Sequence, residues 1–367
     1  MTAALDLTVR HLRDDDLPAV VELLRATFGR WPKVETSAAP IDHLRWKLGD
    51  GRPGVSEHFV GELDGRIVAF QLNHHWRTKV GDREFDVRRG WDSAVHPEVQ
   101  GRGVMSIMRP AMHAKFVEVP DFFLGGSDHP AIPHIHERLS EERHDFGQRW
   151  LVFVRPLTLR AALRTFKLRP GRSPRELFDS LATLRRWRRI DARERTSLPA
   201  EHPYSIRTAE RFDDRIDAFC AEASQQFDFI SVRDKALLNW RYADRRAGDF
   251  TIRLATEGDR IIGYSVLRVT NGAGHIADLL ALPGRLDVVE SLARDAAAQL
   301  RGAAPAIECW LFEHHPYVPA LQSCGFLGRR RRRQLTYEAV GVLQSEIEVL
   351  SDTSTVAHLS VGDIDIV

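Results

Sequence analysis

The chain has 367 residues, of which 43% are hydrophobic and 28% charged, and its formal net charge is +1. This length exceeds what one hydrophobic core usually serves, so we expect about two domains. The near-neutral charge excludes a chain-wide attraction to nucleic acid or anionic lipid, so any basic partner surface must be local. The three cysteines, Cys220, Cys309 and Cys324, are too few for a disulfide framework and lack metal-ligand spacing.

The hydropathy of the chain gives no sign of a membrane segment. Nowhere do about 18 apolar residues run together, as a spanning helix requires. The opening "MTAALDLTVRHLRDDD" has no basic stretch followed by an apolar core of signal-peptide length. We therefore expect a cytoplasmic protein with no membrane span.

Taken in chain order, the predicted elements repeat. "LTVRHLRDDDLPAVVELL" (7–24) opens with a short strand pattern followed by helical spacing, and "YSIRTAERFDDRIDAFCAEA" (204–223) has the same order. "HLRWKL" (43–48) matches "LNWRYA" (238–243), and the hairpin pattern "GELDGRIVAFQL" (61–72) matches "ATEGDRIIGYSV" (255–266). Trp46 and Trp240 lie 240 − 46 = 194 positions apart, and Arg66 and Arg260 lie 260 − 66 = 194 apart. The shared offset predicts an internal duplication; two unrelated α/β domains with common turn chemistry are the alternative.

The composition between the two units predicts a linker. Residues 156–200 are basic and are interrupted by "RPGRSP" (169–174), which ends one helical stretch and permits another. We place a first domain at 1–155, this helical linker at 156–200, a second domain at 201–340 and a tail at 341–367. The arginine-rich helix in the linker could present a solvated face between the domains or a surface for anionic lipid or a partner. The tail could add a strand or lie across a cleft.

The segment "RRGWDSAVHPEVQGRGVMSIM" (88–108) predicts a strand, a glycine loop and a helix. A helix start presents several unpaired N–H groups and the positive end of the helix dipole. Gly101 and Gly103 would let a ligand approach the backbone without a side chain in the way. A phosphate or pyrophosphate is therefore the expected ligand, although the loop matches neither the P-loop nor the G-x-G-x-x-G motif.

At these residues the chain resembles the GNAT superfamily of N-acyltransferases, whose acetyl-coenzyme A loop has Arg or Gln, two residues, Gly, one residue, then Gly or Ala. Gln100, Gly101, Arg102, Gly103 and Val104 fit this pattern, whereas Met105 stands where a small residue is usual. The resemblance implies an α/β (α+β) fold of two tandem GNAT-like domains, each with a mixed, mostly antiparallel sheet flanked by helices. It also implies acetyl-CoA, or another acyl-CoA, as co-substrate. The residues expected to bind it are Val95, Gln100, Gly101, Arg102, Gly103, Val104, Met105 and Ser106.

Direct attack of an amine on a thioester, as the resemblance implies, needs a base for the ammonium proton and an acid for the thiolate. Asp92, on the strand before the loop, is the candidate base; a carboxylate bonded to neighbouring backbone, or to Arg88 or Arg89, is the alternative. His136 stands where the family often has a tyrosine and is the candidate acid. A solvated or core histidine is its alternative reading.

The other polar clusters carry weaker signals. We expect no metal site, because His129, His134 and His136 are spaced five and two apart, which one helix cannot direct at a single ion. His74, His75 and His144 complete the group of six histidines that raises a metal site as an alternative. The arginine run 329–333 could be a strand end that faces solvent or a contact for an anionic acceptor.

The second unit has Asp278 in a place like that of Asp92, but its loop is "ALPGR" (281–285), with Pro283 and a single glycine. Proline contributes no N–H, so the anion cradle is predicted to be missing there. The sequence therefore predicts an N-acyltransferase that moves an acetyl group from acetyl-CoA to a primary amine of a small molecule. An aminoacyl-tRNA-dependent transferase and a non-catalytic acyl-CoA sensor are the alternatives. Nucleic acid is not expected as a partner, because no aromatic residues alternate with the arginines.

Overall fold

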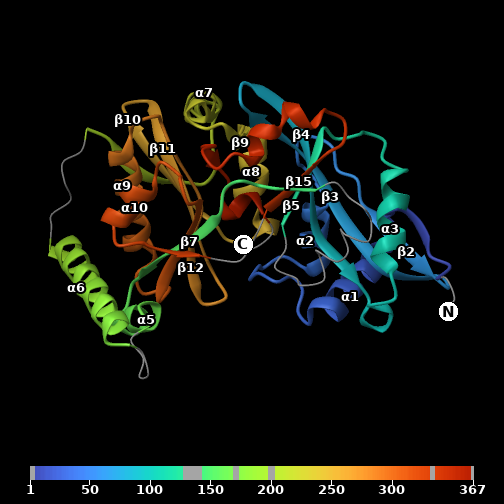
Figure 1. Cartoon of the computed structure of the whole chain (residues 1–367), viewed down its shortest axis with the longest axis horizontal. Coiled ribbons are helices and arrows are strands. Elements are labelled where there is room, and N and C mark those ends of the chain that lie inside the picture. The colour runs from blue at the N-terminus through green and yellow to red at the C-terminus, as the bar shows by residue number, and fades with distance from the viewer. Residues whose placement is uncertain (1–4, 127–142, 168–172, 197–202, 331–334, 365–367) are drawn as a thin grey trace.

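The computed structural model describes residues 5–126, 143–167, 173–196, 203–330 and 335–364. Two mixed sheets lie side by side, and helices flank each of them (Figure 1). The predicted α/β class, with two tandem units of mixed and mostly antiparallel sheet, is confirmed.

The first unit begins with one strand and two helices, which are β1 (Thr8–His11), α1 (Leu17–Phe28) and α2 (Pro40–Lys47). It continues with the antiparallel strands β2 (Phe59–Leu63), β3 (Arg66–Val80) and β4 (Arg83–Val95), followed by α3 (Val104–His113) and β5 (Phe122–Gly126). Helix α1 forms because Leu17, Val20 and Leu24 share one face, which is buried against the sheet. It ends at Gly29, whose φ of 73° suits glycine.

The second unit repeats this order, as the sequence predicts. Its elements are β8 (Ser205–Ala209), α7 (Arg215–Ala223), β9 (Phe229–Ser231), α8 (Lys235–Tyr242), β10 (Thr251–Glu257), β11 (Arg260–Thr270), β12 (Ala273–Ala281), α9 (Leu286–Leu300), β13 (Ala306–Phe312), α10 (Val318–Ser323) and β14 (Leu327–Arg330). The tryptophans that the repeat relates, Trp46 on α2 and Trp240 on α8, stack with ring centroids 5.0 Å apart. The Trp46 indole N–H also donates to the Trp240 carbonyl at 2.9 Å.

The two sheets exchange strands. The first has the order β1-β2-β3-β4-β5-β15-β6, and the second has the order β14-β7-β13-β12-β11-β10-β8. Strand β7 (Trp150–Pro156), close after β6 (His144–Asp145), therefore pairs with β13 and β14 of the second sheet. Strand β15 (Leu335–Ala339) returns to pair with β5 and β6 of the first. The sequence boundaries at 155, 200 and 340 remain a proposal; β7 spans the first of them, and β15, which they assign to the second domain, pairs in the first sheet.

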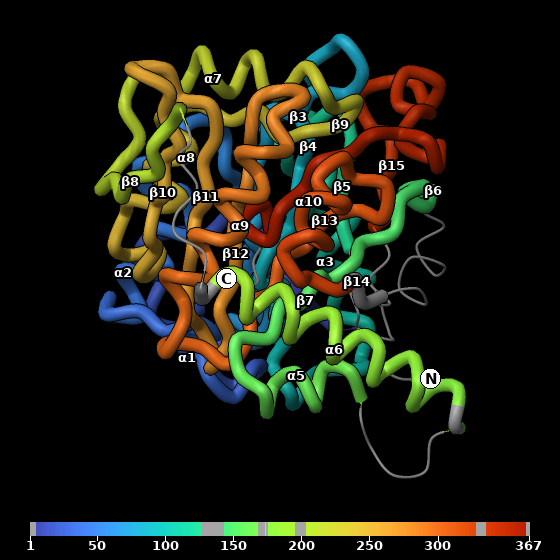
Figure 2. Tube along the Cα trace, turned by 90° about the vertical axis from the view of Figure 1, so that its left-hand side faces the viewer, coloured from blue at the N-terminus to red at the C-terminus, as the bar shows by residue number. Residues whose placement is uncertain are grey.

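The described part of the predicted linker contains α5 (Leu159–Thr165) and α6 (Pro174–Thr196). Both helices lie at the periphery, beside the second sheet (Figure 2). They share a small apolar cluster made of Ala162, Phe166, Leu184 and Trp187. Of the arginine run 329–333, residues 331–333 lie outside the described ranges.

The tail both adds a strand and fills an interior position. Its strand β16 (Ala357–His358) pairs with β9, which in turn pairs with β3 of the first sheet. The following turn η7 (Val361–Asp363) is buried beside β12. Of the two possibilities that the sequence left open for the tail, the added strand therefore occurs in the structure.

Candidate functional site

Strands β4 and β5 diverge next to the glycine loop. Their parallel pairing covers only Val87 with Phe122 and Arg88 with Phe123. Further along β4, the ladder to β3 has an irregularity between Phe70 and Leu72. Asp92 lies opposite this irregularity and has a φ of 40°, which is rare for a residue other than glycine. The second half of β4 therefore forms no pairs with the described residues of β5, and the direction of its backbone changes locally at Asp92.

The glycine loop has the geometry of an anion cradle. Gly101 and Gly103 have φ values of 75° and 81°, and a Cβ added at either would meet no atom within 4 Å. In the described chain, no hydrogen bond reaches the backbone N–H groups of Gly101, Gly103, Val104 or Met105. No acidic residue stands in the first turn of α3. Four N–H groups therefore have no protein acceptor among the described residues at the positive helix end, and the two glycines leave open space beside it, as binding of a phosphate requires.

The surroundings of the loop hold this cradle in place. The Gln100 side-chain amide donates to the Val95 carbonyl at 2.8 Å, and the His96 N–H donates to the Val68 carbonyl at 2.8 Å. Val104 is buried, and Met105 packs against the apolar cluster beneath the loop. Met105, which departs from the family pattern, therefore does not fill the space before the glycines.

The matching helix of the second unit offers no such cradle. The Leu286 N–H bonds to the Gly284 carbonyl at 3.0 Å, and the Arg285 N–H bonds to the Leu282 carbonyl at 3.1 Å. Asp287 occupies the first turn of α9 and is bound by the Arg285 guanidinium at 3.0 Å. Its carboxylate would repel an anion at the same place. These hydrogen bonds and the acidic side chain agree with the missing anion cradle that the loop sequence "ALPGR" predicts for the second unit.

Asp92 is buried in an ion-pair cluster. Its Oδ2 accepts from Lys47 Nζ at 2.6 Å and from the Trp31 indole N–H at 3.1 Å. Its Oδ1 lies 3.3 Å from Lys33 Nζ. The side chains of Asp92 and Lys47 are 1% and 6% exposed, whereas Lys33 is 45% exposed. One partner of the carboxylate is therefore accessible to solvent and the other two are enclosed.

Sequence reasoning missed these three partners of Asp92. Arg88, which it suggested, instead lies with its guanidinium carbon 3.3 Å from the centre of the Phe116 ring. Arg89 donates to Ser231 Oγ at 3.0 Å. A signal for Lys47 was present, since the repeat pairs "WK" at 46–47 with "WR" at 240–241, so a cation follows each stacked tryptophan.

A small recess opens where the two units meet, next to this cluster. It is lined by Lys33, Val34, His43, Trp46, Lys47, Arg241 and Ala247. His43 Nδ1 lies 2.7 Å from the Arg246 carbonyl oxygen. Because a carbonyl oxygen can only accept, this nitrogen carries the proton of the neutral ring. Burial, followed by the nearby Lys47 charge, lowers the pKa of His43 to about 4. His43 therefore contributes a neutral imidazole to the recess at pH 7.

The remaining predicted histidines are placed as follows. His136, the candidate acid, lies outside the described residues, as do His129 and His134. His74 bonds to Ser56 Oγ and the Lys47 carbonyl, both at 2.7 Å, and His75 Nδ1 lies 2.5 Å from Asp86 Oδ2. The imidazole ring of His144 lies tilted against the Tyr337 ring, with the two centroids 5.6 Å apart. Within the described ranges, no group of three or more His, Cys, Asp or Glu side chains could hold a metal ion.

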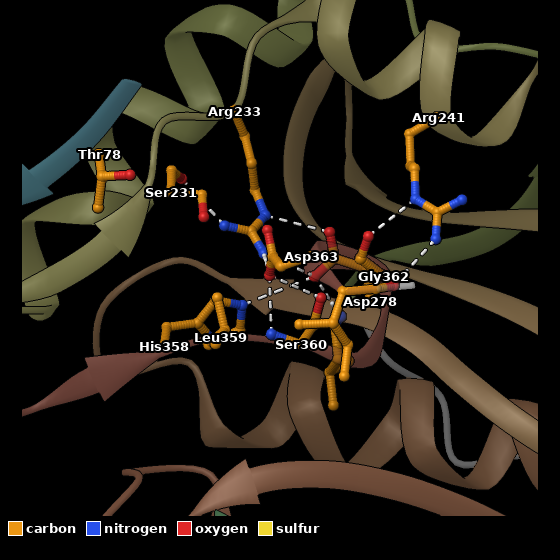
Figure 3. A network of polar contacts seen from close by, with 12 residues as sticks. Thr78, Ser231, Arg233, Arg241, Asp278, His358, Leu359, Ser360, Gly362 and Asp363 are labelled. Atoms are coloured by element: carbon orange, nitrogen blue, oxygen red, sulfur yellow. Dashed lines mark hydrogen bonds and ion pairs between the residues drawn. The ribbon is translucent and has the colours of Figure 1, made fainter. Parts of the chain in front are cut away.

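In the second unit the tail occupies the region that corresponds to the site (Figure 3). The pairing of β12 with β13 ends at Ile276 and Cys309. Gly362 of the tail lies against the next residue of β12, because a Cβ added at Gly362 would be 3.0 Å from the Ala277 carbonyl oxygen. The Trp150 indole donates to the Leu359 carbonyl at 3.1 Å. The chain itself therefore covers the point where these two strands part.

The same segment neutralises the buried charges around Asp278. Arg233 lies 3.1 Å from Asp278 and 2.7 Å from Asp363 of the tail (Figure 3). The Tyr264 hydroxyl donates to Asp278 at 2.8 Å. Although burial opposes ionisation, the Arg233 and His358 side chains keep the pKa of Asp278 below its usual range. Asp278 is thus enclosed within a structural network.

The comparisons with known proteins identify the fold. No protein-family model matches the sequence, and no curated protein sequence matches it. A probable N-acyltransferase of unknown function from Enterococcus faecalis V583 is similar in structure, with a TM-score of 0.62 and 10% identity over 91% of this chain and 73% of that one. A tandem GNAT protein from the clavulanic acid biosynthesis pathway has a TM-score of 0.56 and 15% identity over 92% and 99% of the two chains.

A third similar structure is the N-myristoyltransferase of Saccharomyces cerevisiae with bound myristoyl-CoA and inhibitors. Its TM-score is 0.56, with 11% identity over 93% of this chain and 81% of that chain. In the described parts of the present chain, no helix combines the length and the apolar character needed to cross a membrane.

Proposed function

Since the chain has the tandem GNAT fold, we propose that it is an acyl-CoA-dependent N-acyltransferase that transfers an acetyl group to a primary amine of a small molecule. The thioester of the co-substrate supplies the activated acyl group. The observation that carries the proposal is the loop at Gly101–Gly103, where four backbone N–H groups have no acceptor in the described part of the protein and both glycines leave open space at the start of α3. The fold alone would not distinguish the two units, whereas this loop does.

The first unit would hold the co-substrate through backbone donors. The N–H groups of Gly101, Gly103, Val104 and Met105 would bind the pyrophosphate, and Gln100 would keep the loop against the end of β4. Arg102 is exposed beside them and would add a positive charge. Val95, at the end of β4, and Ser106, in the first turn of α3, would contact the co-substrate from either side of the loop.

Asp92 would receive the proton of the acceptor ammonium. Its Oδ2 is already held by Lys47 and Trp31, so Oδ1 is the atom left for exchange. Lys33, the partner of Oδ1, is the exposed one, and a substrate ammonium has the same charge and hydrogen-bonding capacity. The ammonium would therefore replace Lys33 at Oδ1 before it loses its proton. His136 remains the candidate acid for the departing thiolate.

The second unit would support the site without binding a second acyl-CoA. The hydrogen bonds at the start of α9, the Asp287 carboxylate and the tail beside β12 all oppose an anionic ligand there. Arg241 nevertheless lines the recess beside Asp92, and Trp240 stacks on Trp46, another residue of its lining. The second copy would thus help to form the acceptor pocket.

The experiment is a thermal shift assay with acetyl-CoA, followed by thiol release in the presence of amino sugars, amino acids and polyamines. Acetyl-CoA should raise the melting temperature of the parent, because a ligand that binds the folded state stabilises it. Gly103→Glu should abolish the shift, because a carboxylate would occupy the cradle. Acetyl-CoA binding without turnover of any amine would instead favour a non-catalytic sensor.

A matched control separates the loss of the cradle from backbone strain. Gly81, in the turn between β3 and β4, also has a positive φ, of 59°, and also has nothing within 4 Å of an added Cβ. It lies at the opposite end of β4, about 40 Å from the loop at the usual rise per strand residue. Gly81→Glu should be strained in the same way but should keep the shift with acetyl-CoA. Loss of the shift in both variants would show that the loop is not specifically involved.

A further inference from the structure

Helix α6 has two faces of opposite character. Leu184, Trp187, Asp191 and Glu194 are spaced three, four and three apart and so share one face. Leu184 and Trp187 are buried in the cluster shared with α5, and the Trp187 indole donates to the Pro156 carbonyl at 2.9 Å. This face attaches the carboxyl-terminal half of the helix to the protein.

The acidic side chains of that half also hold the helix against the second unit through ion pairs. Glu194 forms an ion pair with Arg155 of β7, and Asp191 lies 3.1 Å from Arg301. Their charges are therefore neutralised on the inner side of the helix. The arginines of the same half are left on the opposite side.

The outer face of α6 consists of Phe178, Leu181, Arg185, Arg186, Arg188 and Arg189, all of which are exposed. Phe178 is 69% and Leu181 43% exposed, which is unusual for large apolar side chains on an ordered helix. Among the described residues, no carboxylate forms an ion pair with the four arginines. Two exposed leucines of α5, Leu159 and Leu163, lie on the helix that packs beside it.

We propose that this outer face of α6 is a binding surface for an anionic lipid bilayer. Its two apolar side chains would enter the boundary between headgroups and acyl chains, while the four arginines contact lipid phosphates. Helix α6 lies at the left-hand edge of the molecule, outside the second sheet (Figure 1), and its exposed outer side chains are open to the approach of a flat surface. Apolar residues in line with the arginines favour a bilayer over nucleic acid, which would contact the arginines alone. The proposal is independent of the acyl-CoA site.

The test is co-sedimentation of the full chain with vesicles of phosphatidylcholine, alone or mixed with phosphatidylglycerol. The parent should sediment only with the mixed vesicles, and added salt should release it. Arg185→Ser combined with Arg189→Ser should lower the partition coefficient about 30-fold, since each arginine near an anionic surface contributes about 1 kcal/mol. Phe178→Ser combined with Leu181→Ser should lower it about tenfold.

The chain offers matched controls for both changes. Arg207→Ser combined with Arg211→Ser removes the same charge from exposed positions of the second unit. Leu343→Ser removes an apolar side chain that is 71% exposed elsewhere. Both controls, and Gly103→Glu, should sediment like the parent.

Three outcomes would overturn the proposal. The first is no sedimentation with the mixed vesicles, and the second is an equal loss in the Arg207 and Arg211 control. The third is a parent that binds RNA more tightly than vesicles, with the arginine variant impaired and the Phe178 and Leu181 variant unaffected. That last result would assign the surface to nucleic acid.

Discussion

Removing the charge of Asp92 should destabilise the first unit through Lys47. The Lys47 ammonium is 6% exposed and lies 2.6 Å from a carboxylate that is 1% exposed. Breaking a buried ion pair at one partner leaves an uncompensated charge and typically costs about 3–5 kcal/mol. In Asp92→Asn the amide oxygen still accepts a hydrogen bond from Lys47, so we expect the lower end, about 3 kcal/mol. The melting temperature should fall by about 5 °C or more.

A double-variant cycle measured by urea denaturation tests this reasoning. Asp92→Asn combined with Lys47→Met should recover part of the loss, because neither charge then remains buried. Asp42→Asn is the control, since Asp42 and its partner Arg45 are each 51% exposed and should contribute less than about 1 kcal/mol. If Asp92→Asn unfolds at the same urea concentration as the parent, Lys47 does not depend on Asp92 for its burial.

Three further predictions follow from the site and the tail. The pKa of His43 in the folded protein is about 4, below the unfolded value of 6.5, so stability should fall as the pH drops through this window, and His43→Gln should reduce the fall in urea titrations. At a temperature where all variants are folded, Asp92→Asn and His136→Phe should each lower kcat about 100-fold while the Kd for acetyl-CoA stays unchanged. An added Cβ at Gly362 would overlap the Tyr242 hydroxyl, so Gly362→Ala should displace the tail and expose it to limited proteolysis.

The parts of the structure that local sequence patterns determine were predictable. The glycine loop at Gly101 and Gly103 could be predicted because a positive φ favours glycine and because the following helix has its own apolar spacing, both within a few residues. The repeated order of strands and helices followed from periodicity and from the shared offset of 194. The stacked pair of Trp46 and Trp240 lies at equivalent positions of that repeat.

The parts that depend on distant pairing could not be predicted. Strands β7 and β15 have the residue patterns of ordinary strands, and neither sequence indicates which of the two sheets the strand joins. Lys47 and Asp92 are 45 positions apart, and their contact depends on how α2 packs against β4. The tail is buried because β9 and β12 offer it partners, a property of the assembled fold that no alternation in residues 341–367 reveals.

Titration calorimetry with acetyl-CoA tests the central claim most directly. The parent should bind about one molecule per chain, because only the first unit has unpaired N–H groups around Gly103, whereas Asp287 and the tail oppose binding in the second. Replacing the first loop by "ALPGR" should give a folded protein with no site, and Gly81→Glu should keep one. A stoichiometry near two, or binding that survives the loop replacement, would show that the second unit holds acyl-CoA as well.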